Sequence, residues 1–313
     1  MSIISVSLEF ALLVFAGFLI MRIKLVNSDF RGQLSKFVIN VLLPCMIARS
    51  LYGRETGGGT DIPMILLLSV ATIVLLFIAG QAAYVLLGRG DIAKTARFST
   101  MFGNFTFIGF PVVTELYGQS GLFIYALFTL PIRIVFYAAP YFLLSPDRGP
   151  RRIDPKGILG QLVTPPTVSI AVGLIMLLAH IKPPAFIDAA VNALGSAASP
   201  LGMLIVGMGM ADATPQLIWH RRRACAAVLL RNFAAPAVML VMLLLIPADI
   251  NTKQVVFTYA AVPVPSLMTA FSVNAGRSDE ACRDASVTVL ASTLLSVVTL
   301  PCWIYLLKIL LKA

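Results

Sequence analysis

The chain has 313 residues, of which 58% are hydrophobic and only 12% are charged, against roughly 25% charged residues in a typical soluble domain. Its mean hydropathy is +0.91. These values exclude a soluble globular enzyme, a disordered chain and a secreted disulfide scaffold, and they indicate a membrane protein with several spans. The net charge of +10 does not indicate nucleic-acid binding, because the basic residues flank the apolar segments as membrane topology requires.

Ten apolar segments are long enough to cross a bilayer as helices, which takes about 20 residues each. Backbone groups inside lipid must be satisfied within the segment, and these segments do not alternate as porin strands do. The sequence therefore predicts an all-α polytopic membrane protein with short loops. The predicted spans are residues 3–22, 34–52, 62–87, 95–116, 119–144, 158–181, 185–211, 224–247, 254–276 and 285–311.

The basic residues lie mainly on one side of the predicted spans. Sixteen lie in the loops between spans 1 and 2, 3 and 4, 5 and 6, 7 and 8, and 9 and 10, whereas five lie on the opposite side. The positive-inside rule places those five loops in the cytoplasm. We therefore predict a multi-pass protein of the cell membrane (inner or plasma membrane), in contact with lipid, with both termini on the non-cytoplasmic side.

Prolines recur at corresponding positions of two five-span halves. They lie in spans 2, 4 and 5 and again in spans 7, 9 and 10. Because an odd number of spans turns the second half upside down, this pattern favours two inverted five-helix repeats, an architecture of many secondary transporters. The alternative is that proline is simply frequent in membrane helices. The predicted units are a first repeat at 1–144, a short cytoplasmic linker at 145–157 and a second repeat at 158–313.

Spans 4 and 9 are predicted to be broken. Gly103 and Pro111 interrupt span 4, so we expect its helix to open around residues 104–111. Pro263 and Pro265 interrupt span 9 at the corresponding place. Non-helical backbone at membrane depth is tolerated where protein covers it or where it lines a wet cavity. The half-helices that follow begin with free N–H groups and positive dipole ends, which together favour an anion site.

Four stretches of the chain resemble the auxin efflux carrier family, and together they cover both halves. They are residues 34–44, 103–112, 200–208 and 292–301. The resemblance implies ten helices in two inverted repeats, with broken helices 4 and 9 crossing beside the substrate site. It also implies transport of organic anions, malonate among them for bacterial members, and a fold similar to that of bile-acid sodium symporters. Unlike the plant hormone carriers, this chain has a short loop at 145–157, so regulation through that region is not carried over.

Polar side chains beside the two breaks are the candidates for substrate binding. The Asn104 amide can donate to a carboxylate, and the alternative is that it caps the half-helix. Thr106 and Ser266 offer hydroxyl donors, with local backbone bonding as the alternative. Asn40 either reaches the same cavity or bonds to its own helix. The predicted substrate-binding set is Asn40, Asn104, Thr106, Pro111, Arg133, Pro263, Pro265 and Ser266.

Arg133, Arg231 and Glu115 are three of the charged residues within the predicted spans. Arg133 lies near mid-membrane, where its guanidinium can pair with a carboxylate substrate or with an internal partner such as Glu9 or Glu115. Arg231 is expected to extend towards the cytoplasmic surface. Glu115, one turn after Pro111, is a candidate for proton coupling; the alternative, which we favour, is a residue of the outer surface.

These features predict a secondary transporter of small organic anions, carboxylates such as malonate or auxin-like acids, that works by alternating access. The alternatives are an ion channel, which would show rings of like charge or carbonyl filters, and a sodium-coupled symporter of the bile-acid type. No enzyme, cofactor or metal site is expected from the residue pattern. The coupling ion stays open between H⁺ and Na⁺, and a homodimer is the assembly that the resemblance suggests.

Overall fold

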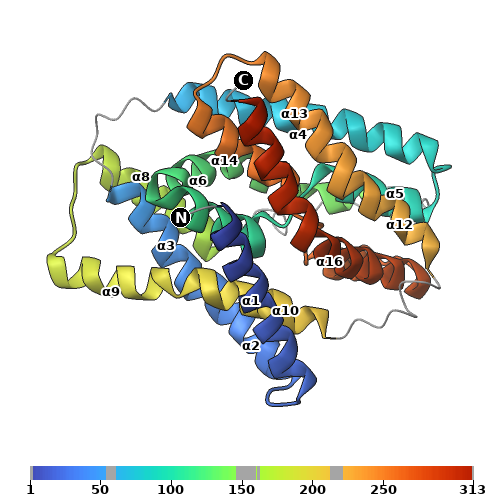
Figure 1. The fold of residues 1–313 in the computed structure, drawn as a ribbon, viewed down its shortest axis with the longest axis horizontal. Helices are drawn as coiled ribbons and strands as arrows, with labels where there is room; N and C mark the ends of the chain where they lie inside the picture. The colour runs from blue at the N-terminus through green and yellow to red at the C-terminus, as the bar shows by residue number, and fades with distance from the viewer. Residues whose placement is uncertain (1–2, 54–60, 146–159, 161–162, 212–220, 312–313) are drawn as a thin grey trace.

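A computed structural model describes residues 3–53, 61–145, 160, 163–211 and 221–311 (Figure 1). Regular structure within these ranges is helical, without strands, which confirms the prediction of an all-α polytopic membrane protein. Short π-helices are labelled η. The elements are α1 (Ile3–Arg22), α2 (Ser28–Phe37), η1 (Val38–Leu42), α3 (Leu43–Tyr52), α4 (Ile62–Leu86), α5 (Asp91–Met101), η2 (Phe105–Gly109), α6 (Phe110–Leu143), α8 (Pro165–Leu178), α9 (Ala185–Ser196), α10 (Ala198–Met210), α12 (Arg222–Leu229), η3 (Leu230–Ala234), α13 (Ala235–Leu245), α14 (Ile250–Ala261), α15 (Met268–Asn274) and α16 (Asp279–Leu310).

Among the described residues, six helical runs are long and apolar enough to cross a membrane. α1, α8 and the α14–α15 pair occupy three further predicted spans. The count of ten crossings nevertheless stays a prediction, and the linker expected at 145–157 lies outside the described residues apart from Ser145. The six runs are Ser28–Tyr52, Ile62–Leu86, Asp91–Leu143, Ala185–Met210, Ala224–Leu245 and Asp279–Leu310.

The long helix α6 contains a kink at Gly118. This glycine has φ 62° and ψ −156°, a backbone conformation that L side chains rarely adopt. It separates residues 110–117 from residues 119–143. The kink therefore lies where the sequence predicts the boundary between the fourth and fifth spans.

Each of the three π-helices ends two residues before a proline, at Pro44, Pro111 and Pro236. A proline lacks an N–H group, and its ring clashes with the carbonyl four residues earlier. The residue before the proline donates instead to the carbonyl five residues back, as Phe110 does to Phe105. The wider π turn thereby accommodates the proline without ending the helix.

This accommodation corrects the expected position of the first break. The prediction that the helix opens around 104–111 is wrong, because residues 105–109 form η2 and Pro111 lies in the first turn of α6. The non-helical residues are instead 102–104, between α5 and η2, and Phe102 there is extended (φ −119°, ψ 134°). The second break lies where it was expected, at residues 262–267 between α14 and α15.

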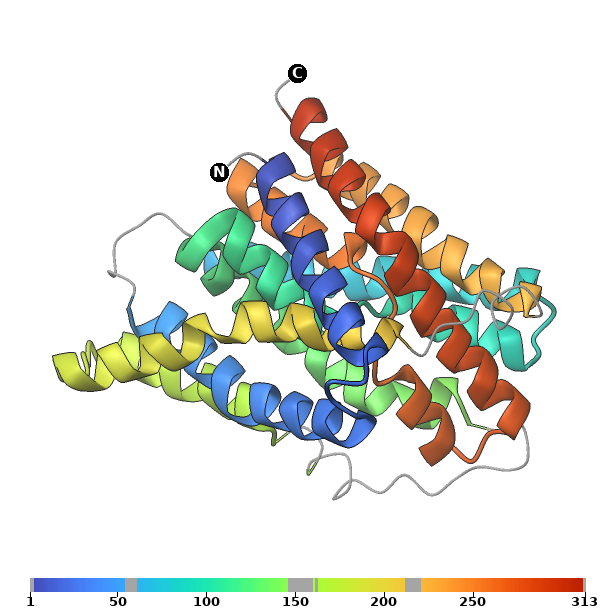
Figure 2. The same cartoon turned by 60° about the horizontal axis from the view of Figure 1, so that its bottom comes forward.

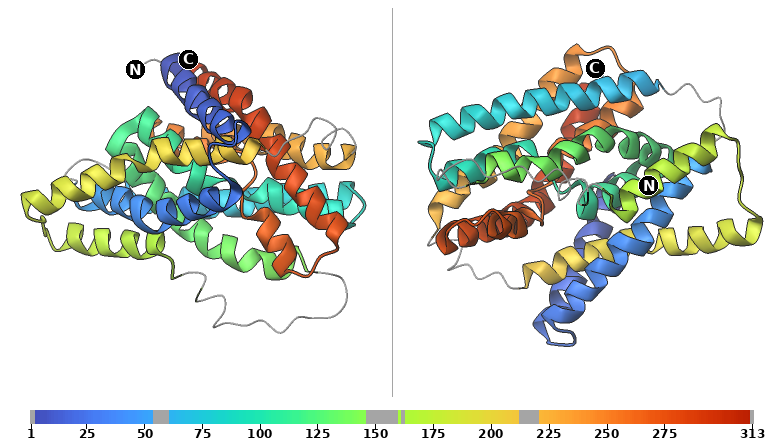
Figure 3. Two further views of the ribbon diagram at one scale, coloured as in Figure 1. Left: turned by 90° about the horizontal axis from the view of Figure 1, so that it is seen from below. Right: turned by 180° about the vertical axis from the view of Figure 1, so that it is seen from behind.

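The helices gather into two groups. α1 packs along α10 and α8 packs along α3, and Figures 1 and 3 show these elements with α9 on one side of the molecule and α4, α5, α13 and α16 on the other. The backbones of α1 and α10 approach each other closely, because a Cβ atom added at Gly207 would lie 1.9 Å from the Val14 carbonyl oxygen. Figure 2 shows that α1 begins and α16 ends on the same side of the molecule.

Candidate substrate site at the crossing of two interrupted helices

The two breaks touch each other. The Asn104 backbone N–H donates to the Pro263 carbonyl at 2.7 Å. The Asn104 side-chain Nδ2 donates to Ser266 Oγ at 2.8 Å. Two segments about 160 residues apart in sequence are thus joined by both backbone and side-chain bonds at the crossing.

Asn104 performs the capping role that was the alternative to substrate binding. Its Oδ1 accepts a hydrogen bond from the Phe107 N–H at 3.2 Å at the start of η2. Since its amide nitrogen is bonded to Ser266, the side chain links the breaks in this conformation. The second half-helix, α15, has only seven residues, so its dipole adds less positive potential than the sequence suggested.

Arg231 binds the other ends of the interrupted helices. It is fully buried, and it donates to carbonyls of Thr100, Tyr259 and Val262 at 3.2, 2.5 and 2.9 Å. The Thr100 and Tyr259 carbonyls belong to the last turns of α5 and α14, where backbone acceptors have no intrahelical partner, and Val262 is the residue that directly follows α14. The expectation that Arg231 extends towards the surface is wrong, because the C-terminal ends of two half-helices attract a cation more strongly at the crossing.

Arg133 lies close to the same crossing, in the part of α6 after the kink. Its side chain is only 1% exposed. Its guanidinium carbon lies 5.1 Å from the centre of the Phe105 ring, and Nε and Nη2 have no hydrogen-bond partner among the described residues. The expected internal partners do not reach it: Glu9 is exposed, and Glu115 accepts a bond from Ser199.

Two cavities meet at the crossing. A small one of about 30 Å³ is lined by Asn104, Arg133 and Ser266, among others. A larger one of about 450 Å³ runs beside α10 and α16 and includes Arg31 in its wall. Phe107 and Ser266 line both cavities, so these two side chains form the partition between them.

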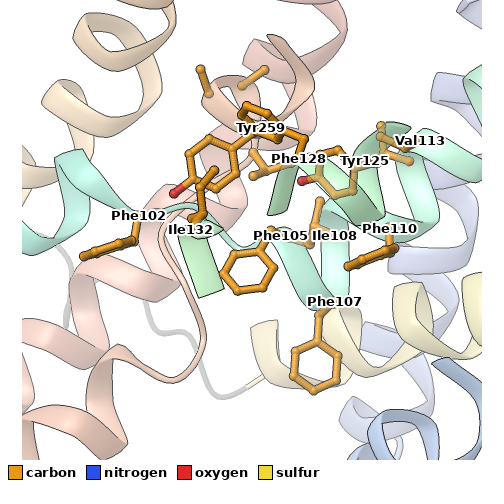
Figure 4. Packing of buried hydrophobic residues seen from close by; sticks show 14 of the residues in the cluster. Phe102, Phe105, Phe107, Ile108, Phe110, Val113, Tyr125, Phe128, Ile132 and Tyr259 are labelled. Carbon is orange, nitrogen blue, oxygen red and sulfur yellow. The ribbon is translucent and has the colours of Figure 1, made fainter. Parts of the chain in front are cut away.

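Aromatic rings surround the Arg133 guanidinium. Phe105, Phe136 and Tyr137 line the small cavity with it, and Phe105 and Phe136 pack edge to face with ring centres 5.3 Å apart. The Phe105 and Tyr259 ring centres lie 6.4 Å apart, and Figure 4 shows Phe107 on the far side of Phe105 from Phe128 and Tyr259. The cavity therefore combines one unpaired cation with largely apolar walls.

Four other residues of the predicted substrate-binding set have distinct positions. Thr106 and Pro265 line the small cavity. Pro263 is buried and supplies the carbonyl that Asn104 binds. Pro111 is buried in the first turn of α6, next to α10, where a Cβ atom added at Gly202 would lie 3.4 Å from its ring.

Asn40 does not join the site, because its side chain is exposed and the preceding residue, Ile39, lines the small cavity instead. A one-residue step along a helix turns the side chain by about 100°, so the neighbouring position faces the crossing. Glu115 is half-buried, and its Oε1 accepts a hydrogen bond from Ser199 of α10 at 3.0 Å. It therefore lies against α10, outside the residues that line the two cavities.

Sequence reasoning missed the bridging role of Arg231 and the aromatic residues Phe136 and Tyr137. The position of Arg231 is signalled only weakly, by a basic residue five positions before Pro236 in an apolar span. The two aromatic residues follow Arg133 by three and four positions, which places them on one face of the helix. That spacing is visible in the sequence.

Replacing Asn104 with Ala is expected to lower the stability of the protein by about 1–3 kcal/mol and to abolish uptake, because a cap and the link between the breaks are both lost. Thermal unfolding and uptake into proteoliposomes measure the two effects. Asn27→Ala is the matched control, since Asn27 caps α2 at an exposed position through the Phe30 N–H. It should cost about 1 kcal/mol and leave uptake unchanged. Normal uptake by Asn104→Ala would contradict the site.

Two interrupted helices that meet at a cavity inside a multi-pass helical protein are typical of secondary transporters. The sequence pattern of the family described as membrane transport protein matches residues 3–155 and 145–304. The chain therefore belongs to this family, the auxin efflux carrier family, as the four stretches of resemblance predicted. It is also 26% identical over 310 residues to an uncharacterized transporter of Methanothermobacter thermautotrophicus, with 95% of each chain covered. The protein is a multi-pass membrane transporter.

Proposed function

We propose that the protein is a secondary transporter of small organic anions, with the substrate carboxylate bound to Arg133 at the crossing. The observation that carries this proposal is the Arg133 guanidinium, which is 1% exposed and has two nitrogens without a partner beside a cavity. A buried charge without a partner costs several kcal/mol, and a charge within a membrane protein usually has a functional role. A guanidinium fits a carboxylate through two parallel hydrogen bonds.

The electrostatics of the crossing favour an anion. The Arg133 guanidinium lies over the Phe105 ring, and the Arg231 guanidinium lies over the Tyr259 ring. The two ring centres are 6.4 Å apart, so the rings separate two buried cations. Among the described residues that line the two cavities, none is Asp or Glu. The local charge is therefore positive, and an entering carboxylate supplies the balance.

The walls of the small cavity favour a single carboxylate attached to a small apolar body. Among the described residues that line the small cavity, Arg133 supplies the one guanidinium, and the neighbouring Phe105 and Phe136 rings offer no hydrogen-bond donors. The second carboxylate of a short dicarboxylate such as malonate lies one carbon from the first, so it would be desolvated against these aromatic faces. We therefore propose that monocarboxylates bind more tightly than dicarboxylates such as malonate.

The proposed mechanism is alternating access. The small cavity of about 30 Å³ has room for no more than a few waters, so the body of the substrate occupies the larger cavity once Phe107 and Ser266 move apart. The helix packing supports inverted repeats at 1–144 and 158–313. The first span of the first repeat, α1, packs on α10 in the second span of the second repeat, and the first span of the second repeat, α8, packs on α3 in the second span of the first. One helix group then moves against the other around the site.

Arg31 lines the larger cavity and lies in α2, within the first of the basic segments that the sequence predicts to be cytoplasmic loops. By the positive-inside rule, this cavity opens to the cytoplasm, with both termini on the other side of the cell membrane. Glu115, which contacts Ser199 of α10, stays the candidate for proton coupling. A homodimer stays the proposed assembly.

The proposal is tested by adding a panel of acids to the purified protein and following its thermal unfolding. Propionate, butyrate and phenylacetate are expected to raise the midpoint, malonate to raise it less, and the matched amides to leave it unchanged. Saturable uptake and counterflow of the stabilising acid in proteoliposomes then separate a carrier from a channel. Equal stabilisation by acids and amides, or no stabilisation of folded protein by any carboxylate, would contradict the proposal.

A further inference from the structure

The guanidinium of Arg231 occupies a position towards which backbone carbonyls converge from two elements. The Thr100 carbonyl comes from the last turn of α5, and those of Tyr259 and Val262 come from the end of α14 and the break after it. The C-terminal end of a helix carries the negative end of its dipole. Carbonyls of unwound backbone and half-helix C-terminal ends are also the groups with which secondary transporters coordinate sodium ions.

No acidic side chain in the described part of the chain balances this guanidinium. Arg231 is 0% exposed, and no described Asp or Glu forms a salt bridge with it. Its partners are the three carbonyls and the Tyr259 ring, whose centre lies 5.6 Å from the guanidinium carbon. A monovalent cation bound by carbonyl dipoles would have the same surroundings.

The site is shaped for a planar cation with several donors. Nε, Nη1 and Nη2 each bind a different carbonyl, which a rigid guanidinium can do and a single ammonium group cannot reproduce. Gly103 leaves the necessary room, because a Cβ atom added there would lie 2.2 Å from Arg231 Nη2. The absence of a side chain at Gly103, in the first break, thus makes room for the Arg231 guanidinium, which comes from η3.

We propose that Arg231 is a tethered cation that fills a monovalent-cation site at the crossing, so that the crossing needs no sodium ion to hold its two breaks together. The proposal deepens the proposed transport function, on which its consequence for coupling rests. Because the charge is covalently attached, the site stays occupied at every ion concentration. Carboxylate transport is therefore independent of sodium, in contrast to a sodium-coupled symporter.

The wild-type protein gives the first test. Thermal unfolding and carboxylate uptake are compared in sodium chloride and in N-methylglucamine chloride at equal ionic strength. Both are expected to be unchanged. A sodium-dependent midpoint or sodium-dependent uptake in the wild type would overturn the proposal, whatever the variants do.

Two variants test the site itself. Arg231→Ala leaves the carbonyls with empty space, and its midpoint is expected to fall by roughly 6–12 °C. Guanidinium ion at millimolar concentration, far below the molar range in which it unfolds proteins, should recover part of this loss. Arg231→Met fills the same space with an apolar chain and should not respond. An Arg231→Ala protein that responds to neither guanidinium nor sodium, or an equal response of Arg231→Met, would overturn the proposal.

Arg231→Lys keeps a tethered charge in case Arg231→Ala does not fold. Arg231→Lys is expected to remain folded and to unfold at the same midpoint in sodium chloride and in N-methylglucamine chloride. Stabilisation of this variant by sodium would contradict a cation site that the tethered charge already fills. The unfolding measurements need no substrate. If the wild type does not transport carboxylates but Arg231→Ala responds to guanidinium, the proposed function is rejected and the cation site is retained. If the wild type transports carboxylates but Arg231→Ala does not respond, the cation site is rejected and the proposed function is retained.

Discussion

Replacing Arg133 with Met is expected to raise the stability of the folded protein while it abolishes carboxylate binding and uptake. The guanidinium is buried with Nε and Nη2 unpartnered, and a buried charge in this state costs several kcal/mol. Its contact with the Phe105 ring at 5.1 Å returns about 1–2 kcal/mol, which is the smaller quantity. Met has a similar unbranched shape without the charge, so we expect a net gain of about 1–4 kcal/mol.

Thermal unfolding of the purified variant and proteoliposome uptake measure the two effects of Arg133→Met. Arg231→Met is the matched control, because it removes the other guanidinium that is buried at the crossing. There the guanidinium has three carbonyl partners, so the variant should lose about 3–5 kcal/mol. Opposite signs for the two substitutions would reflect the difference between an unpaired and a paired cation. A destabilised Arg133→Met protein would mean that Arg133 has a structural role.

Replacing Gly103 with Ala is expected to disrupt the crossing and to abolish uptake. An added Cβ atom would lie 2.2 Å from Arg231 Nη2, 2.7 Å from the Val262 side chain and 2.8 Å from the Tyr259 carbonyl oxygen. The Tyr259 oxygen belongs to the backbone, and the guanidinium is held by three hydrogen bonds, so these neighbours cannot yield cheaply. We expect a loss of about 1–3 kcal/mol or more, the usual range for overpacking.

Gly32→Ala is the control for the same chemical change at an open helical position. Gly32 lies within α2, and nothing lies within 4 Å of a Cβ atom added there. Alanine is preferred over glycine inside a helix, so stability should rise by about 0.5–1 kcal/mol and uptake should stay normal. Thermal unfolding and uptake of both variants are compared. A Gly103→Ala protein as stable and active as Gly32→Ala would contradict the close contact at the crossing.

The fold class and the position of the second break follow from local sequence features. Hydropathy alone predicts helices, because a chain in lipid must satisfy its own backbone groups. Pro263 and Pro265 locate the second break correctly, since two prolines separated by one residue deprive a turn of two N–H donors. The juxtaposition of Asn104 with Ser266 agrees with the crossing of spans 4 and 9 that the family resemblance implied.

Other features depend on tertiary contacts that one sequence does not reveal. Pro111 suggested an open segment around itself, but a π turn absorbs it and moves the break to residues 102–104. Arg231 suggested a path to the surface, but the carbonyls that hold it come from α5 and α14, about 130 and 30 residues away. The exposure of Asn40 depends on the rotation of its helix, which hydropathy does not fix.

The most direct test of a carboxylate site at Arg133 is the dissociation constant of one stabilising monocarboxylate for the wild-type protein and for Arg133→Met. Both proteins are expected to be folded, so the comparison isolates the guanidinium. Loss of a charge-assisted pair worth about 1.5–3 kcal/mol predicts binding that is weaker by a factor of about ten or more. An unchanged dissociation constant in a folded Arg133→Met protein would contradict the site and place the anion elsewhere.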